Sequence, residues 1–222
     1  MSLPSSIDRA LIEGLVRETL RKELSARGSG AKPELLVNVS ARHMHVTQEE
    51  LEILFGKGHQ LKVHKWLYQE GQFAAEETVT LIGPRKRIIP NLRILGPCRT
   101  LTQIELAYTD ALQLGIDVPV RHSGDIAGTT GGWVMGPKGM IEMKQGIIRA
   151  ARHVHMSPAD AETFGVRHKD MMKLRIVAPA CTTTFEDLLV RVDKSFKLEV
   201  HIDTDEGNSC NLDNAISMEL LK

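Results

Sequence analysis

The chain of 222 residues is poor in aromatic residues and carries no excess charge of either sign. Aromatic residues make up only 4% of it, which argues against a surface that stacks exposed nucleic-acid bases. The 28 lysine and arginine residues balance the 28 aspartate and glutamate residues, so no overall basic field attracts a polyanion. We therefore expect no nucleic-acid partner.

Cysteines and long apolar runs are also scarce. The three cysteines are odd in number and scattered, which argues against a disulfide framework and for a reducing compartment. No apolar run approaches the roughly 20 residues that a membrane-spanning helix needs. The N-terminal segment carries acids and arginines among its apolar residues, unlike a secretory signal. These absences predict a cytoplasmic protein with no membrane partner.

The remaining composition, 42% hydrophobic and 25% charged, is typical of a soluble globular protein. Short segments rich in Val, Ile and Leu, separated by Gly, Pro or Asp, predict strands at residues 34–40, 77–83, 87–96, 173–179, 187–193 and 196–203. Helical segments between them are few. The pattern favours a mainly β fold of barrels or sandwiches over a doubly wound sheet.

The N-terminal region has a different pattern. Residues 6–24 place apolar side chains at helical spacing with charges between them, and residues 26–33 read as a flexible linker. Such an amphipathic helix can pack on its own domain or at a dimer interface. It can also act as a detachable docking peptide that recruits the protein to a partner surface.

One internal repeat organises the chain. The sequence ARHMHV at residues 41–46 returns as ARHVHM at residues 151–156, 110 positions later. A helix cap with an acid three residues on follows each copy, at Thr47 and at Ser157. The chain therefore contains one structural unit twice, and we expect the two copies to meet about a pseudo-twofold axis.

Each repeat carries a His-x-His pair, His43 with His45 and His153 with His155. Residues i and i+2 of a strand point to the same face, so each pair sets two imidazoles side by side and suits a shared metal ion. The alternative is surface or capping histidines of a duplicated barrel. His201, at the end of another predicted strand, is a candidate fifth ligand, although a single such histidine is more often structural.

A carboxylate can complete the ligand set. Glu105 lies in an alternating segment and either bridges two metal ions or is an exposed strand residue. Five histidines and one carboxylate suffice for two metal sites with open positions, which catalysis requires. Nitrogen ligands without a cysteine cluster favour zinc, with cobalt, iron or nickel as alternatives. The remaining histidines are interpreted as surface residues: His59, His64, His122 and His168.

Arginines near turns form the second chemical signal. Arg99 directly precedes the Glu105 segment, and a guanidinium is the preferred group for a phosphate oxyanion. Residues 83–87 and Arg93 add a local basic patch. The glycine-rich residues 123–139 are interpreted as tight turns, with an anion-binding loop as the alternative. Cys98, beside Arg99, is better explained as a packed cysteine than as a nucleophile, because no base motif accompanies it.

These motifs together resemble a known family. The segments RHMH (42–45), QFAAEETVTLIGP (72–84), GPCRTLTQIE (96–105), SGD (123–125), RHVHMS (152–157) and HIDTDEGN (201–208) are similar, in the same order, to phosphate propanoyltransferases. These are the phosphotransacylases of propanediol-utilising bacterial microcompartments. The resemblance runs from about residue 34 to the C-terminus. Two departures are small: GNS follows HIDTDE, where relatives usually have a small residue, Asn and Ala, and Cys98 stands where relatives can carry an aliphatic residue.

The resemblance implies a pseudo-duplicated fold of two β-barrel domains with short capping helices. Residues 33–42 together with 151–222 would form the first barrel and residues 43–150 the second. Residues 1–32 would be an N-terminal amphipathic helix and linker, with a possible encapsulation peptide. A centre of two zinc ions per chain would lie between the barrels.

The resemblance also assigns site residues by motif. His43, His45 and Glu105 would bind the first zinc, and His153, His155 and His201 the second. Arg99 would hold phosphate, and Ser123 would be a nearby polar contact. Coenzyme A would contact Val39, Ser40, Ala41, Arg85, Arg93 and Asn208.

The implied activity is the reversible transfer of a short acyl group, propanoyl or acetyl, between coenzyme A and inorganic phosphate, giving acyl phosphate. The implied partners are shell or core proteins of a bacterial microcompartment, contacted through residues 1–25, and a second copy in a homodimer. Two alternatives remain. The spacing at residues 43–50 fits a cupin-like metalloenzyme, with Gly56 following but no glycine five residues upstream. A zinc-stabilised scaffold without activity is the other.

Overall fold

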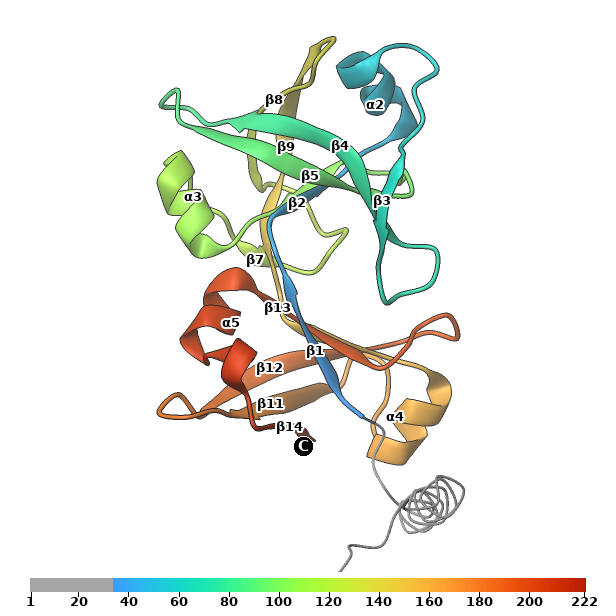
Figure 1. Ribbon diagram of the computed structural model, residues 1–222, viewed down its shortest axis with the longest axis vertical. Coiled ribbons are helices and arrows are strands. Elements are labelled where there is room, and N and C mark those ends of the chain that lie inside the picture. The colour runs from blue at the N-terminus through green and yellow to red at the C-terminus, as the bar shows by residue number, and fades with distance from the viewer. Residues whose placement is uncertain (1–33) are drawn as a thin grey trace, which may run out of the picture. The chain divides into compact units, whose positions relative to one another are not determined.

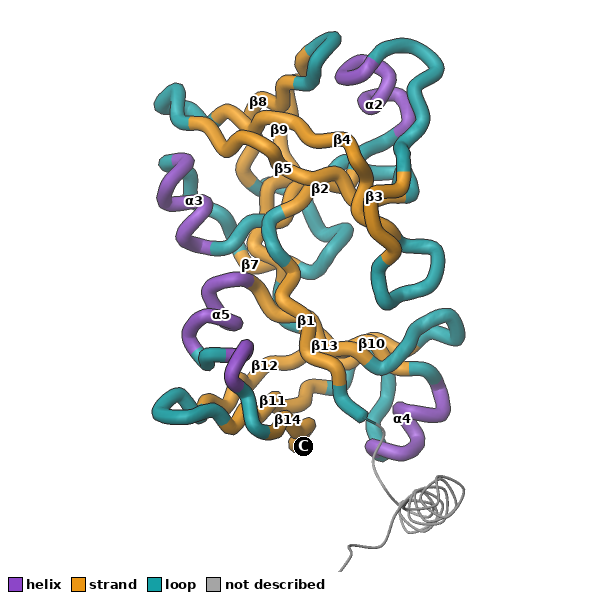
Figure 2. Tube along the Cα trace, viewed as in Figure 1, coloured by secondary structure: helices purple, strands orange, loops and turns teal. Residues whose placement is uncertain are grey.

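The structure is a computed structural model that describes residues 34–222. The amphipathic helix, the linker and the possible encapsulation peptide predicted at residues 1–32 lie outside the described residues. Strands dominate residues 34–222, and their helices are short (Figures 1 and 2). The mainly β fold class predicted from the sequence is therefore confirmed. None of the helices in this part of the chain is long and apolar enough to cross a membrane.

The first sheet contains a closed barrel. Its strands are β2 (His43–His45), β3 (Val63–Trp66), β4 (Phe73–Ile82), β5 (Ile88–Gly96), β6 (Gln103–Glu105), β7 (Val120–Arg121), β8 (Thr130–Met135) and β9 (Met140–Ala150). Pairing runs from β4 through β5, β2, β6, β9 and β8 and returns to β4. The edge strands β3 and β7 pair with β4 and β9 outside this ring.

The second sheet is an open half-barrel. Its strands are β1 (Leu36–Ser40), β10 (His153–Met156), β11 (Met171–Val177), β12 (Thr183–Val192), β13 (Glu199–Asp203) and β14 (Ser217–Leu221). Their order is β1-β13-β10-β12-β11-β14, and no pairing among the described residues joins β1 to β14. The family resemblance implied two barrels, and the one assigned to residues 33–42 and 151–222 is open.

The two sheets repeat one pairing pattern. β2 is parallel to β5 and antiparallel to β6, and β10 is likewise parallel to β12 and antiparallel to β13. β6 and β13 each then pair with a parallel strand, β9 in the first sheet and β1 in the second. The duplication seen in the sequence is therefore also present in the strand pairing.

The repeats exchange the strand that precedes each His-x-His pair. β1 leads directly into β2 but pairs with β13 in the second sheet, and β9 leads into β10 but pairs with β6 in the first (Figure 1). Both histidine pairs therefore follow a crossing of the chain from one sheet to the other. The division into domains 33–42 with 151–222 and 43–150 stays a prediction, and this exchange supports it.

The short helices start at the predicted caps. The hydroxyl of Thr47 accepts a hydrogen bond from the amide of Glu50 at the start of α2 (Gln48–Phe55), and Ser157 does the same for Asp160 in α4 (Pro158–Phe164). The other helical segments follow β6 and β13: α3 (Tyr108–Leu114), α5 (Thr204–Ser209) and the 3-10 turn η1 (Leu212–Asn214).

Each sheet has its own hydrophobic core, and strand alternation turns the second histidine pair away from it. On β10, Val154 and Met156 are fully buried in the core of the second sheet, whereas His153 and His155 are only partly buried on the opposite face. A narrow cleft on this face is lined by residues of both sheets, among them Glu105 and His153.

Candidate metal centre

Strand register assembles two groups of side chains that can each hold a metal ion. In the first group, His43 and His45 project from β2, and Glu105 on β6 lies directly opposite His43. In the second group, His153 and His155 project from β10, and His201 on β13 lies opposite His153. Within each group the candidate ligand atoms all lie within 4.8 Å of one another. The structure thus brings together all six predicted ligands, in two equivalent arrangements.

The first group has the spacing of ligands around one ion. The Nε2 atoms of His43 and His45 are 3.1 Å apart, and Oε2 of Glu105 is 3.6 Å from Nε2 of His43. The Nδ1 atoms face backbone carbonyls, that of Ala41 at 2.8 Å and that of Leu95 at 3.4 Å. A neutral ring that donates from Nδ1 has no proton on Nε2, so the two Nε2 lone pairs face each other. Two ligands of a tetrahedral zinc ion lie roughly 3.3 Å apart, so a shared cation fits this spacing.

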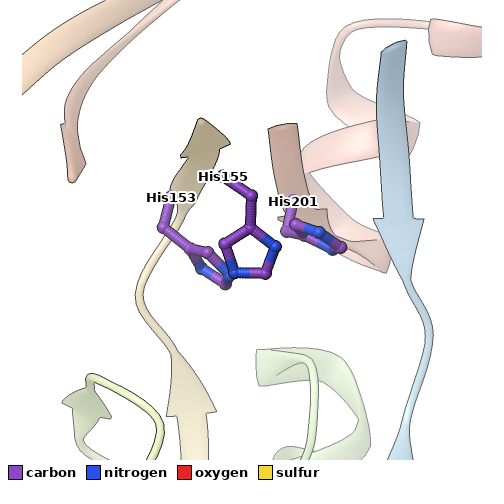
Figure 3. A group of neighbouring side chains, drawn as sticks. All are labelled: His153, His155 and His201. Carbon is purple, nitrogen blue, oxygen red and sulfur yellow. The ribbon is translucent and has the colours of Figure 1, made fainter. Parts of the chain in front are cut away.

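The second group leaves buried nitrogen atoms without partners. Figure 3 shows the three imidazoles of this group facing one another, and their ring centroids are 4.7 to 4.9 Å apart. Nδ1 of His153 faces the carbonyl of Ala151 at 2.9 Å, whereas neither ring nitrogen of His155 has a hydrogen-bond partner. Nε2 of His201 lies 3.1 Å from Glu199 but without hydrogen-bond geometry. Buried polar atoms of this kind are costly unless a ligand satisfies them, and a metal ion would do so.

Burial holds three of the imidazoles in the neutral form. It lowers the pKa of His45 to about 2, with the neighbouring His43 and Arg99 adding to the effect. It likewise lowers the pKa of His153 to about 3 and that of His155 to about 2, and the charge of His201 adds to both shifts. Neutral imidazole is the form that binds a metal ion.

A glutamine links the predicted carboxylate ligand to the predicted serine. Nε2 of Gln103 donates to Glu105 at 2.7 Å and to the hydroxyl of Ser123 at 3.0 Å, and its Oε1 accepts from the amide of Gly124 at 2.7 Å. Gln103 was not predicted from the sequence as a site residue. The one feature of the sequence that could have indicated it is its position two residues before Glu105, which places both side chains on the same face of a strand.

The two groups meet at one cleft. Its lining is Ser40, Glu105, Leu106, Ala150, Ala151, His153, His201, Ile202 and Asp203. It therefore joins the carboxylate of the first group to two imidazoles of the second.

Two arginines lie close enough to the two ligand groups to act on them electrostatically. Arg99 is exposed, donates to Gln72 at 3.5 Å, and acts electrostatically on Glu105, His45 and His155. Arg191 on β12 acts on Glu105, His153 and His155. Partial desolvation lowers the pKa of both arginines, while Glu105 opposes that effect. Arg99 was predicted from the sequence, whereas Arg191 was missed, because no motif places residue 191 near the histidines.

The residues predicted to contact coenzyme A lie in three places. Val39 and Ser40 are on β1, Ala41 follows them, and α5 packs on β1 so closely that a Cβ on Gly207 would meet Val39 at 2.6 Å. Asn208 is the next residue of that helix. Arg93 lies opposite His43 and donates to the carbonyl of Ala75 at 2.6 Å, and Arg85 packs at 3.4 Å from the Cβ position of Gly115, which follows α3.

Two alternative sites find no support in the geometry. The cupin-type spacing His-x-His-x3-Glu needs Glu49 beside His43 and His45, but Glu49 is exposed in the first turn of α2, and Glu105 takes the place beside the two histidines. Burial raises the pKa of the Cys98 thiol, and this side chain packs against the hydrophobic core of the first sheet. It therefore resembles a packed cysteine more than a reactive thiolate.

Comparison with known proteins identifies the family. The family model described as phosphate propanoyltransferase matches residues 36–213. A phosphate propanoyltransferase of Planctopirus limnophila is 53% identical over 226 residues, covering 98% of this chain and 93% of that protein. Those of Thermotoga maritima (47% over 197 residues, 89% of each chain) and Salmonella typhimurium (42% over 200 residues, 90% of this chain and 93% of that protein) are also similar. The chain therefore belongs to the phosphate propanoyltransferase family, and it is an acyltransferase.

Proposed function

We propose that this enzyme reversibly transfers a propanoyl or acetyl group between coenzyme A and inorganic phosphate at a centre of two zinc ions. The observation that carries the proposal is the meeting of two equivalent ligand groups at one cleft, next to a guanidinium with a single weak hydrogen bond. Members of the family that this chain resembles bear the name of this reaction.

The proposed zinc ligands are His43, His45 and Glu105 for one ion, and His153, His155 and His201 for the other. The facing Nε2 atoms of the first group and the partnerless nitrogens of the second support this assignment. When bound, zinc supplies Lewis acidity toward a carbonyl oxygen or a sulfur atom. Gln103 would keep the carboxylate of Glu105 in its ligand orientation.

Arg99 would hold the phosphate anion for attack on the thioester. A phosphate oxygen then forms a bond to the carbonyl carbon as the phosphate loses its proton, the carbon–sulfur bond breaks, and coenzyme A leaves as a thiolate that takes up that proton through the solvent. Holding the nucleophile in place removes much of the orientational cost of bringing two substrates together. Neither ligand group contains a nucleophilic side chain such as serine or cysteine, so we propose direct transfer in a ternary complex without an acyl-enzyme.

Coenzyme A would lie along Val39, Ser40 and Ala41, with Asn208 beside them and Ser123 as a nearby polar contact of the site. The packing of α5 on β1 supports grouping the first four of these residues. The positive charges of Arg85 and Arg93 suit the phosphates of coenzyme A. Arg93 donates to backbone carbonyls through Nη1 only, so its other N–H groups are available to a ligand.

A thiol-release assay with acetyl-CoA and propanoyl-CoA, with and without phosphate, tests the reaction. We expect free thiol only when phosphate is present, in equal amount with acyl phosphate. Thiol release without phosphate would identify a hydrolase and overturn the proposal. Ping-pong kinetics or a trapped acyl-protein would overturn direct transfer and leave the overall reaction in place.

We further propose that the enzyme is cytoplasmic, is recruited by residues 1–25 to shell or core proteins of a bacterial microcompartment, and forms a homodimer. The amphipathic pattern of residues 6–24 supports a docking or dimer-forming helix. Deleting residues 1–25 should leave soluble activity intact and change only the location of a fluorescent fusion in cells. A truncated protein that fails to fold would show instead that this segment is structural.

A further inference from the structure

Arg191 occupies a strand position that faces the second ligand group. β12 runs parallel to β10, and Arg191 is the register partner of His155. Register partners on neighbouring strands project from the same face of a sheet. The residue before it, Val190, is fully buried in the core on the other face. Arg191 therefore shares the face of the imidazoles.

An aromatic ring fixes the position of this arginine beside the imidazoles. The guanidinium carbon of Arg191 lies 5.8 Å from the ring centroid of Phe196. The same ring stacks on His155, with centroids 4.1 Å apart and planes inclined by 21°. The guanidinium is thus held next to the second ligand group without being part of it.

This guanidinium has no counter-ion of its own, unlike the partly buried guanidinium groups of Arg149 and Arg152. Arg149 pairs with Asp203 and Glu206, and Arg152 pairs with Glu206. Within residues 34–222, Arg191 makes neither a hydrogen bond nor an ion pair with a carboxylate. A partly desolvated cation left in this way is unfavourable unless a ligand neutralises it.

Arg99 converges on the same place. Both guanidinium groups act on Glu105, and the charge of Arg191 lowers the pKa of Arg99, so the two cations repel each other. Two cations that face a single carboxylate leave an excess of positive charge, which is typical of a site for a multiply charged anion.

We propose that Arg191 binds the phosphoryl group of the substrate, as a second phosphate-binding arginine opposite Arg99. This inference rests on the proposed function. In the forward direction the anion is inorganic phosphate, and in the reverse direction it is the phosphoryl group of the acyl phosphate. Coenzyme A is the less suitable ligand, because its proposed contacts lie elsewhere. Val39, Ser40 and Ala41 are at β1, which two strands separate from β12, and Arg85 and Arg93 belong to the β4–β5 hairpin of the other sheet.

Substitution of Arg191 by Met, which keeps much of the side-chain volume and removes the charge, tests the proposal. We expect the KM for phosphate and for acyl phosphate to rise at least about tenfold, as for the loss of one charge-assisted hydrogen bond. The KM for acyl-CoA and the metal content should stay within about twofold of the wild type. Arg191→Lys should recover part of the loss. Arg175→Met, on the exposed face of β11, is the matched control and should change nothing.

Phe196→Leu separates phosphate binding from a structural role. If Arg191 only supports His155 through Phe196, then Arg191→Met and Phe196→Leu will both lose metal and raise the KM of both substrates alike, which overturns the proposal. Unchanged KM values for phosphate in Arg191→Met would also overturn it, with the proposed function intact. A wild-type enzyme without phosphate-dependent turnover would instead refute the proposed function. If Arg191→Met does not fold, Arg191→Lys takes its place as the test. We then expect its KM for phosphate to rise severalfold, and an unchanged KM would contradict the proposal.

Discussion

Backbone carbonyls decide which nitrogen of an imidazole is available at this site. The carbonyls of Ala41 and Ala151 face Nδ1 of the first histidine in each pair, at equivalent positions of the two repeats. Each of these alanines precedes its histidine by two residues. The duplicated segment therefore includes both the histidine and the carbonyl group that orients its ring. The duplication thus conserves a metal-binding tautomer in both halves.

Spacing along the sequence could predict the histidine pairs but not the whole site. Residues two apart on a strand share a face, so His43 with His45 follows from the sequence alone. Whether Glu105 joins them depends on the register of β6 against β2, which spacing leaves open. Arg191 and Gln103 depend on such register as well, and both were missed.

Replacing Arg99 by Ala tests the residue proposed to hold phosphate. Because its guanidinium would orient and stabilise the attacking anion, we expect phosphate-dependent turnover to fall by roughly a hundredfold or more. Metal content should be unchanged, since Arg99 is not a ligand. Steady-state kinetics and elemental analysis measure the two quantities. Arg167→Ala, an exposed arginine after α4, is the control, and near-normal activity in Arg99→Ala would contradict the assigned role.

At the scale of elements, the β8–β9 hairpin closes the first barrel. β8 pairs with both β4 and β9, and this hairpin has no equivalent that closes the second sheet. The sequence interpretation of residues 123–139 as tight turns was wrong for β8 (Thr130–Met135). The glycines that suggested turns serve another purpose, since a Cβ on Gly131 would collide with the backbone of Met143 and Lys144.

The other predicted strands agree with the structure except at their ends. The segment 187–193, for example, overlaps the second half of β12 (Thr183–Val192), and 196–203 contains β13 (Glu199–Asp203). Alternation of apolar residues marks the buried middle of a strand, whereas its ends depend on pairing with neighbours. The local sequence pattern also cannot predict that β1 and β9 are exchanged between the sheets. Only the family resemblance implied this exchange.

Gly131→Ala tests the barrel closure. The new methyl group must displace the backbone of β9, so we expect a loss of about 2 kcal/mol in the free energy of unfolding. Gly132→Ala, one residue on, is the matched control, because none of its Cβ contacts is under 3.1 Å: the flexible ends of Ile147 and Leu81 lie at 3.1 and 3.4 Å, and the carbonyl of Ile82 at 3.3 Å. Urea denaturation of both variants gives the comparison. Equal stability of the two would show that the close approach does not limit this pairing.

At the scale of the whole described unit, polar contacts join the two sheets around the cleft. Arg149 at the end of β9 pairs with Asp203 at 2.6 Å and with Glu206 at 3.1 Å, and both acids are buried. The hydroxyl of Thr109 in α3 donates to Asp205 at 2.6 Å. These contacts hold the two ligand groups at one cleft, so the geometry of the site depends on them.

Arg149→Met tests this coupling. Two buried carboxylates would lose a partner, so we expect unfolding to become easier by about 3 kcal/mol, together with weaker activity. Arg121→Met is the matched control: it lines the same cavity of about 480 Å³, but its ion pair with Asp125 is exposed, at 3.7 Å. The control should lose about 1 kcal/mol or less. Denaturant unfolding measures both, and a stable Arg149→Met would show that these contacts do not hold the sheets together.

The central claim is that two equivalent ligand groups each hold one divalent ion. Elemental analysis of the purified wild type, His153→Ala and His64→Ala tests it most directly, since His64 lies on the exposed strand β3 outside both groups. The account predicts about two, one and two ions per chain, with zinc as the metal. A fully active wild type without bound divalent ions, or a His153→Ala variant that keeps both, would contradict it.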